Sequence, residues 1–385
     1  MNATLSLPPL ALYVHLPWCV RKCPYCDFNS HALKGDLPAE AYIAALLDDL
    51  EQDLPLTWGR PVSSIFFGGG TPSLFSAADV DQLLSGIRAR VALSPACEIT
   101  LEANPGTIEH DRFAAYRDAG INRVSLGVQS FDDDLLKAIG RIHGRAEVER
   151  AIGSLHDAGL ENFNIDLMYA LPGQSREQAD ADVRRAIAAR PAHVSHYQLT
   201  LEPNTAFAAA PPPGIADDET AWDMQGDAAE RLTGAGFAQY EVSAWARDDA
   251  RCRNNLNYWA FGDYLGIGAG AHAKLTDPAN DRVLRLAKSR HPKRYMAGER
   301  VAEEKAISPD ECVFEFFLNG LRLRDGFRRE AFEARTGLPW QRVESRVTDA
   351  VGRGLLEPSE GGYRPSDLGW RFVNDLQAIF LPGSD

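Results

Sequence analysis

The stretch "YVHLPWCVRKCPYCDFNSH", from Tyr13 to His31, decides how this chain is interpreted. It contains Cys19, Cys23 and Cys26, three of only six cysteines in 385 residues. A closed structural metal site has four protein ligands, so the spacing Cys-x3-Cys-x2-Cys leaves this set one ligand short. Another group must therefore complete whatever these thiols bind.

The length and charge of the chain limit the classes of protein to which it can belong. A chain longer than about 250–300 residues usually divides its core, so we expect one large domain and a smaller one. The formal net charge of −14 argues against a protein whose main role is to bind nucleic acid, because such proteins present basic faces. No nucleic-acid partner is expected.

No apolar run approaches the roughly 18 residues that a membrane-spanning helix needs. The first residues lack a basic leader and run directly into the cysteines. We therefore expect a soluble, cytoplasmic protein without a membrane span, and peripheral contact with a membrane stays open. In a reducing compartment, clustered cysteines are more typical of metal ligands or catalytic groups than of disulfides.

Short β-rich runs alternate with helical patterns through the first half of the chain. The expected strands are residues 10–16, 63–69, 97–103, 122–128, 162–169 and 194–201. The expected helices between them are residues 38–54, 76–91, 107–120, 145–159 and 175–190. This alternation predicts a parallel sheet with helices outside it, and six units are too few for a complete eight-unit barrel. We therefore expect an α/β fold with an open or partial barrel.

Polar residues and glycines fall at the carboxyl ends of successive expected strands. His15, Gly68–Gly70, Glu102, Gln129 and Asp166 all lie at or just after such an end. Sheets of this kind bind ligands at that edge. These residues should therefore face one cavity, with the cysteine loop across its mouth.

The cysteine motif "CVRKCPYC" after the first strand, "GGGTP" after the second, and the six-fold alternation together resemble the radical S-adenosylmethionine enzymes. The resemblance implies a partial (β/α)6 barrel in which Cys19, Cys23 and Cys26 bind a [4Fe–4S] cluster. S-adenosylmethionine then binds the fourth iron and supplies the missing ligand. The alternative on the cysteines alone is a zinc site completed by His15 or His31. A structural zinc site does not need a glycine triplet after the next strand.

One branch of that superfamily fits better than the rest. "LYVHLPWC", "FFGGGTPS", "EANPGT", "SLGVQSF", "IGRIHG", "NIDLMYALPGQ" and "YQLTLEPNT" are similar to the oxygen-independent coproporphyrinogen III oxidase group. In that group "GGGTP" holds the amino group of the methionine moiety, and an aromatic residue at the position of Tyr25 lies against the adenine. The S-adenosylmethionine pocket implied by this resemblance consists of Tyr13, Tyr25, Gly69, Gly70, Thr71, Glu102, Gln129, Arg141 and Asp166.

The chain departs from the oxidases directly after the third cysteine. The oxidases have a fourth cysteine two residues further on, where this chain has Phe28. The run from Cys19 to Ser30 instead resembles the signature of heme chaperones in the same superfamily. This resemblance implies that the protein binds heme and passes it to an unidentified acceptor hemoprotein. An oxidase-like enzyme acting on a tetrapyrrole and a zinc-stabilised binding module are the alternatives, and whether the protein is an enzyme stays open.

The segment "NLNYWAFGDYLGIGAGAHA", residues 255–273, resembles the region that follows the heme-associated motif His-Asn-x-x-Tyr-Trp of the chaperones. Asn255, Tyr258 and Trp259 match this motif, but Asn254 stands at the histidine position. Asparagine is not a usual axial ligand of heme iron. The residues considered as replacements are Cys252, His193, His196 and His272.

We divide the chain into three parts: residues 1–210, the barrel with the cysteine loop; residues 211–300, an extension with the chaperone-like segment; and residues 301–385, a C-terminal domain. Helical patterns and a glycine-turned hairpin in the last part resemble a winged-helix unit. A local basic cluster is expected at Arg322, Arg324, Arg328 and Arg329. Acidic side chains nevertheless outnumber basic ones there, which favours a packing or docking role over DNA binding.

Overall fold

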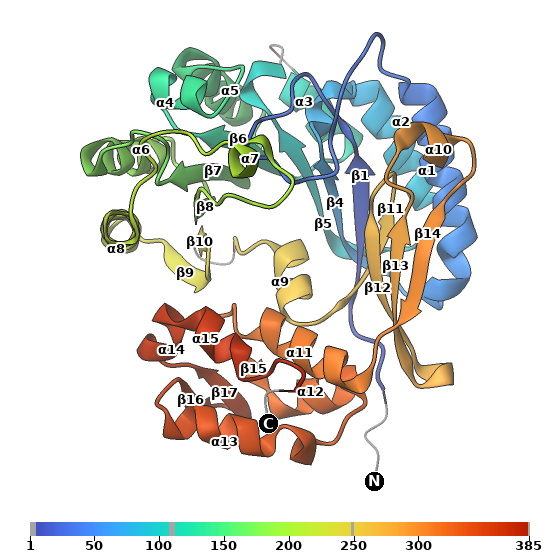
Figure 1. The fold of residues 1–385 in the computed structure, drawn as a ribbon. Coiled ribbons are helices and arrows are strands. Elements are labelled where there is room, and N and C mark those ends of the chain that lie inside the picture. Colours follow the sequence, from blue (N-terminus) through green and yellow to red (C-terminus); the bar gives the residue numbers. More distant parts are fainter. Residues whose placement is uncertain (1–4, 108–111, 248–249, 384–385) are drawn as a thin grey trace.

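Six parallel strands with helices on their outer side form the centre of the molecule (Figure 1). This computed structural model describes residues 5–107, 112–247 and 250–383. The strands are β1 (Leu10–Leu16), β4 (Val62–Gly69), β5 (Leu93–Ala103), β6 (Arg123–Gln129), β7 (Phe163–Tyr169) and β8 (His193–Gln198). Each lies where the alternation predicts it, although β8 ends three residues before the expected limit.

Helices connect these strands as expected: α1 (Ala39–Asp53), α2 (Ala77–Arg88), α3 (Arg112–Ala119), α5 (Arg145–Asp157) and α6 (Arg176–Ala188). Capping boxes fix two of the starts, because Ser76 and Ser175 each accept a backbone N–H three residues on. Residues 108–111 of the helix expected at 107–120 lie outside the described residues. A short helix, α4 (Asp133–Ala138), was not expected, and it begins at an Asp132 cap that only the structure identifies.

The sheet is larger than the sequence predicted. It has twelve strands in the order β14-β13-β12-β11-β1-β4-β5-β6-β7-β8-β10-β9. Beyond β1 the added strands are β11 (Asp263–Ile267), β12 (His272–Asp277), β13 (Arg282–Lys288) and β14 (Val301–Ala306); beyond β8 they are β10 (Ala244–Ala246) and β9 (Ala238–Glu241). With β14 and β9 at its two edges, the sheet is a partial barrel with antiparallel extensions.

Alternate residues of the six central strands face opposite sides of the sheet. The residues that face the helices are apolar and buried in the main core, as Val14, Phe67, Leu101, Leu126 and Ile165 show. Their neighbours in sequence point into the barrel and are mostly polar. The interior of the barrel is therefore lined by polar side chains, while the apolar core lies between sheet and helices.

The C-terminal part has a hydrophobic core of its own, built on contacts between aromatic rings such as those of Phe316, Phe317 and Phe332. Its helices are α11 (Pro309–Gly320), α12 (Arg329–Thr336), α13 (Glu344–Gly352), α14 (Asp367–Arg371) and α15 (Val373–Ala378). The strand β15 (Phe327–Arg328) and the hairpin β16 (Leu356–Ser359) and β17 (Gly362–Pro365) complete a winged-helix-like unit.

Three of the four arginines of the expected basic cluster are held in separate intramolecular contacts. Arg324 lies over the Trp370 ring and pairs with Asp367, and Arg329 lies over Trp340. Arg322 pairs with Glu241, which belongs to the sheet. These contacts direct the cationic groups to different elements, and the Arg322 pair attaches the C-terminal part to the sheet.

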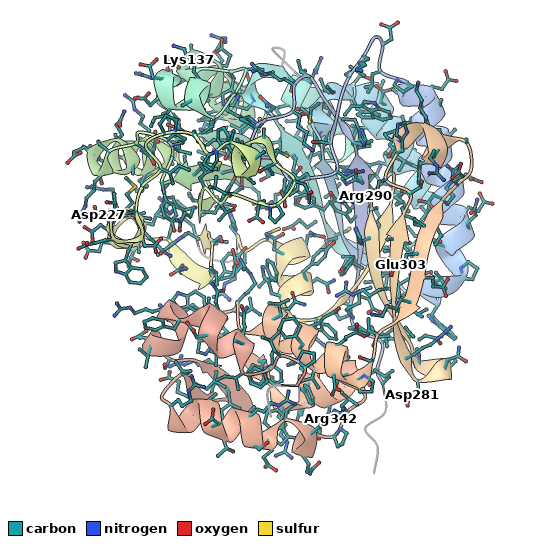
Figure 2. All side chains as sticks on the ribbon, in the orientation of Figure 1. Lys137, Asp227, Asp281, Arg290, Glu303 and Arg342 are labelled. Atoms are coloured by element: carbon teal, nitrogen blue, oxygen red, sulfur yellow. The ribbon has the colours of Figure 1, made fainter. Side chains whose placement is uncertain are left out.

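A buried ion-pair network attaches β11 and β12 to the central sheet. The fully buried Asp263 carboxylate accepts hydrogen bonds from Arg60 at 2.8 Å and Lys274 at 3.0 Å. By contrast, charged groups such as Lys137 point outward at the edge of the molecule (Figure 2). A buried charge that loses its partner costs far more free energy than an exposed one.

We therefore predict that Asp263→Ala lowers the free energy of unfolding by about 3–5 kcal/mol, because Lys274 is left buried without its carboxylate. The matched control is Asp134→Ala, which breaks the exposed pair with Lys137 and should cost less than about 1 kcal/mol. Urea unfolding followed by circular dichroism measures both. Equal effects of the two substitutions would show that the network does not stabilise the sheet.

Candidate functional site

The barrel encloses a cavity of about 610 Å³. The cysteine loop closes one end, at the carboxyl ends of the strands, and α9 (Arg253–Trp259) lies at the other end, between the sheet and the C-terminal helices (Figure 1). Every residue that the sequence analysis assigned to the cluster or the S-adenosylmethionine pocket lines this cavity: Tyr13, Cys19, Cys23, Tyr25, Cys26, Gly69, Gly70, Thr71, Glu102, Gln129, Arg141 and Asp166.

The cysteine loop is held by backbone hydrogen bonds to the strand ends. Cys19 ends the short strand β2 (Trp18–Cys19), which pairs with β3 (His31–Ala32), and the Thr71 N–H donates to the Trp18 carbonyl at 2.7 Å. Arg141 donates to the Cys23 thiol at 3.8 Å. Burial raises the pKa of the Cys19 and Cys26 thiols.

All six cysteines carry free thiols. Three soft sulfur ligands that face one cavity suit an iron–sulfur cluster, in which each thiolate binds a different iron. Within the described ranges, no group of three or more His, Cys, Asp or Glu side chains could hold a single metal ion.

His15 differs from the expectation, because neither it nor Gly68 is among the residues that line the cavity. The two ring nitrogens of His15 are taken up by the Tyr13 hydroxyl at 3.0 Å and the Asn29 carbonyl at 2.9 Å. Burial lowers its pKa to about 4. His15 therefore holds the backbone of the cysteine loop at Asn29, and it has no ring nitrogen left for a metal.

The glycine turn is required by contacts within the protein. A Cβ on Gly69 would lie 2.6 Å from His15, and one on Gly70 would lie 2.5 Å from the Trp18 carbonyl oxygen. Gly69 also has a φ of +113°, which disfavours any other residue. These glycines let the loop and His15 pack against the strand end, and both also line the cavity.

Two carboxyl groups face the cavity beyond this turn. Burial and the neighbouring Asp166 raise the pKa of Glu102 to about 8, and Glu102 accepts a hydrogen bond from the Gly69 N–H at 3.2 Å. Burial also raises the pKa of Asp166, which accepts from Ser125 and Asn164. A cationic ligand group placed between them would favour their ionised forms.

Gln129 and Arg141 lie on the same side of the cavity. Gln129 has a φ of +72° and accepts a hydrogen bond from the Tyr197 hydroxyl at 2.7 Å. Arg141 donates to the Gly127 carbonyl at 2.6 Å, and its Nε has no acceptor. Tyr25 packs near Phe207, with 6.5 Å between the ring centres. These groups leave polar and aromatic surface free toward the cavity.

The chaperone-like segment lines the other end of the same cavity, through Asn254, Asn255, Tyr258 and Trp259. Asn254 is buried, its N–H donates to Glu98 at 3.3 Å, and its side-chain oxygen lies 3.5 Å from the Ser64 hydroxyl. This segment follows Cys26 by more than 220 residues, so its position in the same cavity as the cysteine loop is a result of the tertiary fold.

Of the four replacements considered for the missing histidine, Cys252 alone is among the residues that line the cavity. Its thiol lies 3.6 Å from Glu98, and burial raises its pKa to about 12. Both ring nitrogens of His193 are hydrogen-bonded, to Asn164 and Tyr240, and His196 stacks on Tyr169. His272 is exposed on β12.

Sequence reasoning missed the polar residues deep in the barrel. They are Arg123, Ser125, Asn164, Ser195, Tyr197, Glu241, Ser243 and Arg322. Five of them stand at every second position of β6, β7 and β8, so the alternation along each strand was the signal that could have identified them. Glu241, Ser243 and Arg322 carry no comparable local signal.

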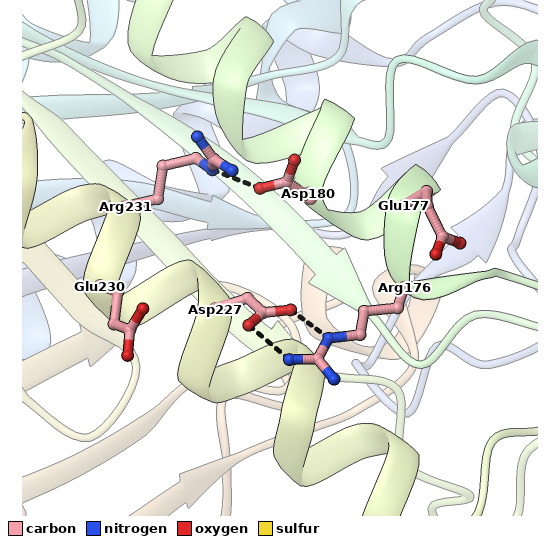
Figure 3. A pocket seen from close by; sticks show the side chains of 6 residues that line it. All are labelled: Arg176, Glu177, Asp180, Asp227, Glu230 and Arg231. Atoms are coloured by element: carbon pink, nitrogen blue, oxygen red, sulfur yellow. Dashed lines mark hydrogen bonds and ion pairs between the residues drawn. The ribbon is translucent and has the colours of Figure 1, made fainter.

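A separate hollow lies between α6 and α8 (Asp218–Gly234). Figure 3 shows its six charged side chains, with Arg176 paired to Asp227 and Arg231 paired to Asp180. Its lining is charged throughout, and its pairs join two surface helices. This hollow has the character of a surface ion-pair network.

The fold and the cysteine-lined cavity define a member of the radical SAM superfamily, whose profile matches residues 13–186. A second profile, the HemN C-terminal domain, matches residues 307–372. The structure is similar to that of coproporphyrinogen III oxidase from Escherichia coli, with a TM-score of 0.82 over 98% of this chain and 91% of that one. At 23% identity this similarity shows the fold alone.

Curated relatives identify the branch. The heme chaperone HemW of Escherichia coli strain K12 is 48% identical over 98% of this chain and 99% of its own length. That of Haemophilus influenzae is 47% identical with the same coverage, and that of Bacillus subtilis is 30% identical over 96% and 98%. This chain belongs to the HemW family. No helix within the described residues is long and apolar enough to cross a membrane.

We predict that Glu102 makes stability depend on pH. Its pKa of about 8 in the folded state lies above the ordinary value of 4.5, so the folded protein keeps a proton that the unfolded chain loses. The free energy of unfolding without added ligand should therefore fall as the pH rises from about 5 to 8. Glu102→Gln should show a smaller fall, measured by urea unfolding at several pH values.

The control for this prediction is Glu360→Gln, which changes an exposed carboxyl group far from the cavity. It should keep the pH dependence of the parent. If Glu102→Gln also keeps it, the Glu102 carboxyl is ionised in the folded protein and the assigned pKa is wrong.

Proposed function

We propose that this protein binds heme in the barrel cavity and passes it to an acceptor hemoprotein, in the cytoplasm. In this proposal Cys19, Cys23 and Cys26 hold a [4Fe–4S] cluster, and exchangeable S-adenosylmethionine occupies the open iron. One observation carries the proposal: the cysteine loop and the segment from Asn254 to Trp259 line the same cavity. The names of the relatives, which are heme chaperones, support it.

The cavity residues divide between the two ends according to their chemistry. Near the cysteine loop, Glu102, Asp166, Gln129 and Arg141 supply carboxyl, amide and guanidinium groups suited to an amino-acid moiety and ribose hydroxyls. When bound, the cluster with S-adenosylmethionine would supply redox chemistry at the iron that no cysteine holds. Tyr25, beside Phe207, offers an aromatic surface for a base.

Near α9, aromatic side chains supply flat apolar surface for a macrocycle. Tyr258 and Trp259 of α9 line this part of the cavity. Asn254 offers no usual axial ligand for the iron. Cys252 lies beside it, but its high pKa means that the thiol would have to lose its proton before it could bind iron as a thiolate.

Phe28 separates this proposal from decarboxylation of a porphyrinogen. It stands where the oxidases have a fourth cysteine, it lines the cavity, and 59% of it is exposed. Phe28 therefore offers an apolar contact surface at the mouth of the cavity, where the oxidases have a thiol.

The test uses the anaerobically reconstituted, reduced protein. Titration with hemin should give a saturable shift of the Soret band, and incubation with coproporphyrinogen III, reductant and S-adenosylmethionine should yield no decarboxylated product. Decarboxylation without heme binding would instead assign the protein to the oxidases.

For the cluster, we predict that Cys23→Ala abolishes the [4Fe–4S] absorption and the paramagnetic signal of the reduced form, because each of the three thiolates binds a separate iron. Cys97→Ala and Cys312→Ala are the controls, since these buried thiols lie outside the lining of the cavity. Both should keep the full iron and sulfide content. A full cluster in Cys23→Ala would contradict the assignment.

For heme, we predict that Asn254→His tightens hemin binding and shifts the Soret band, because it restores a nitrogen ligand beside Tyr258 and Trp259. Cys252→Ala should weaken binding if that thiol supplies the ligand in the parent. Optical titration under reducing conditions compares the three forms. If all three bind alike, the iron does not lie at this segment.

A further inference from the structure

Arg123 stands out among the residues inside the barrel. It is the first residue of β6, it is only 2% exposed, and it lines the cavity. Its Nε is buried without an acceptor. Among the residues that the structure describes, its guanidinium group takes part in no hydrogen bond or ion pair, so a full positive charge stands inside the protein without a direct partner.

Nearby groups stabilise this charge through space but supply no hydrogen bond to it. Burial lowers the pKa of Arg123, but its neighbours, with Cys252 and Glu98 first among them, raise the pKa by more. One oxygen of Glu98 is already occupied, because it accepts the N–H groups of Arg253 and Asn254 and faces the Cys252 thiol. A buried cation that lacks hydrogen bonds is costly, and such groups concentrate at binding sites.

Two further donors at this end of the cavity also lack acceptors. Trp259 Nε1 and Arg322 Nε are both buried and unpartnered, and both residues line the cavity. Arg322 lies over the Trp259 ring at 4.4 Å and donates to Glu241 through its Nη2. All three unpaired groups are N–H donors, and Arg123 is a cation without a hydrogen bond or ion pair, so the missing partner is an anionic acceptor.

We propose that the α9 end of the cavity binds a carboxylate of the ligand, with Arg123 as its main partner. This inference rests on the proposed function, in which the ligand is heme with two propionate groups. Arginine is the side chain best suited to a carboxylate, because its planar donors match the two oxygens. The propionate edge of the macrocycle then points toward Arg123, and its apolar edge points toward the cysteine loop.

The experiment compares hemin with hemin dimethyl ester, in which both propionates are esterified and uncharged. The parent should bind hemin about tenfold or more tightly than the ester, as a charge-assisted hydrogen bond provides. Arg123→Gln should lose about that factor for hemin and bind the ester like the parent. Arg123→Lys, which keeps the charge, should bind hemin with an affinity between those of the parent and Arg123→Gln.

The control variant is Arg300→Gln. Arg300 is also buried, at 7% exposed, but it pairs with Asp48 outside the cavity. Arg300→Gln shows how the loss of a buried arginine outside the cavity affects stability. This variant should leave the ratio of hemin to ester affinity unchanged. Thermal unfolding of each variant shows whether it is folded.

Three outcomes would overturn the inference. If the parent binds hemin and the ester equally, no carboxylate is recognised, and this comparison needs no variant at all. If Arg123→Gln weakens both ligands alike, the residue is structural, and heme binding itself stands. If the parent binds neither ligand, the proposed function fails and the carboxylate site fails with it.

Discussion

The alternation of side chains along six parallel strands is the constraint on which the rest of this structure depends. Each strand gives every second residue to the contact with the helices and the others to the interior of the barrel. The outward residues, such as Phe67 and Leu126, supply the apolar burial that stabilises the fold. The inward residues are thereby free to be polar, and the protein gains a polar cavity without weakening its core.

This division has an electrostatic consequence. Glu102, Asp166, Arg123 and Arg141 all line the cavity inside the barrel, where charges interact more strongly than in water. The raised pKa of Glu102 and the unpartnered guanidinium of Arg123 both reflect the free energy that it costs to remove a charged group from water. A cationic ligand group would relieve the first cost and an anionic group the second, which is why we assign the two ends of the cavity to different ligand chemistry.

The C-terminal part belongs to the site as well as to the surface. Its core includes Phe261, directly after α9, and Val283 of β13. Arg322 reaches from it to Glu241 and Trp259. The C-terminal unit therefore closes the α9 end of the barrel, and Arg322 makes this contact.

The sequence by itself determined the cysteine spacing, the glycine turn, the six-fold alternation and the capped helix starts, because these signals depend on residues close together in the chain. It also indicated the segment from Asn254 to Trp259 by resemblance. Only the tertiary structure decided that this segment shares a cavity with the cysteines, that His15 supports the loop from beneath, and that Arg123 and Arg322 converge at one end. Such contacts depend on strand register and on how far the barrel closes, and no local pattern encodes either.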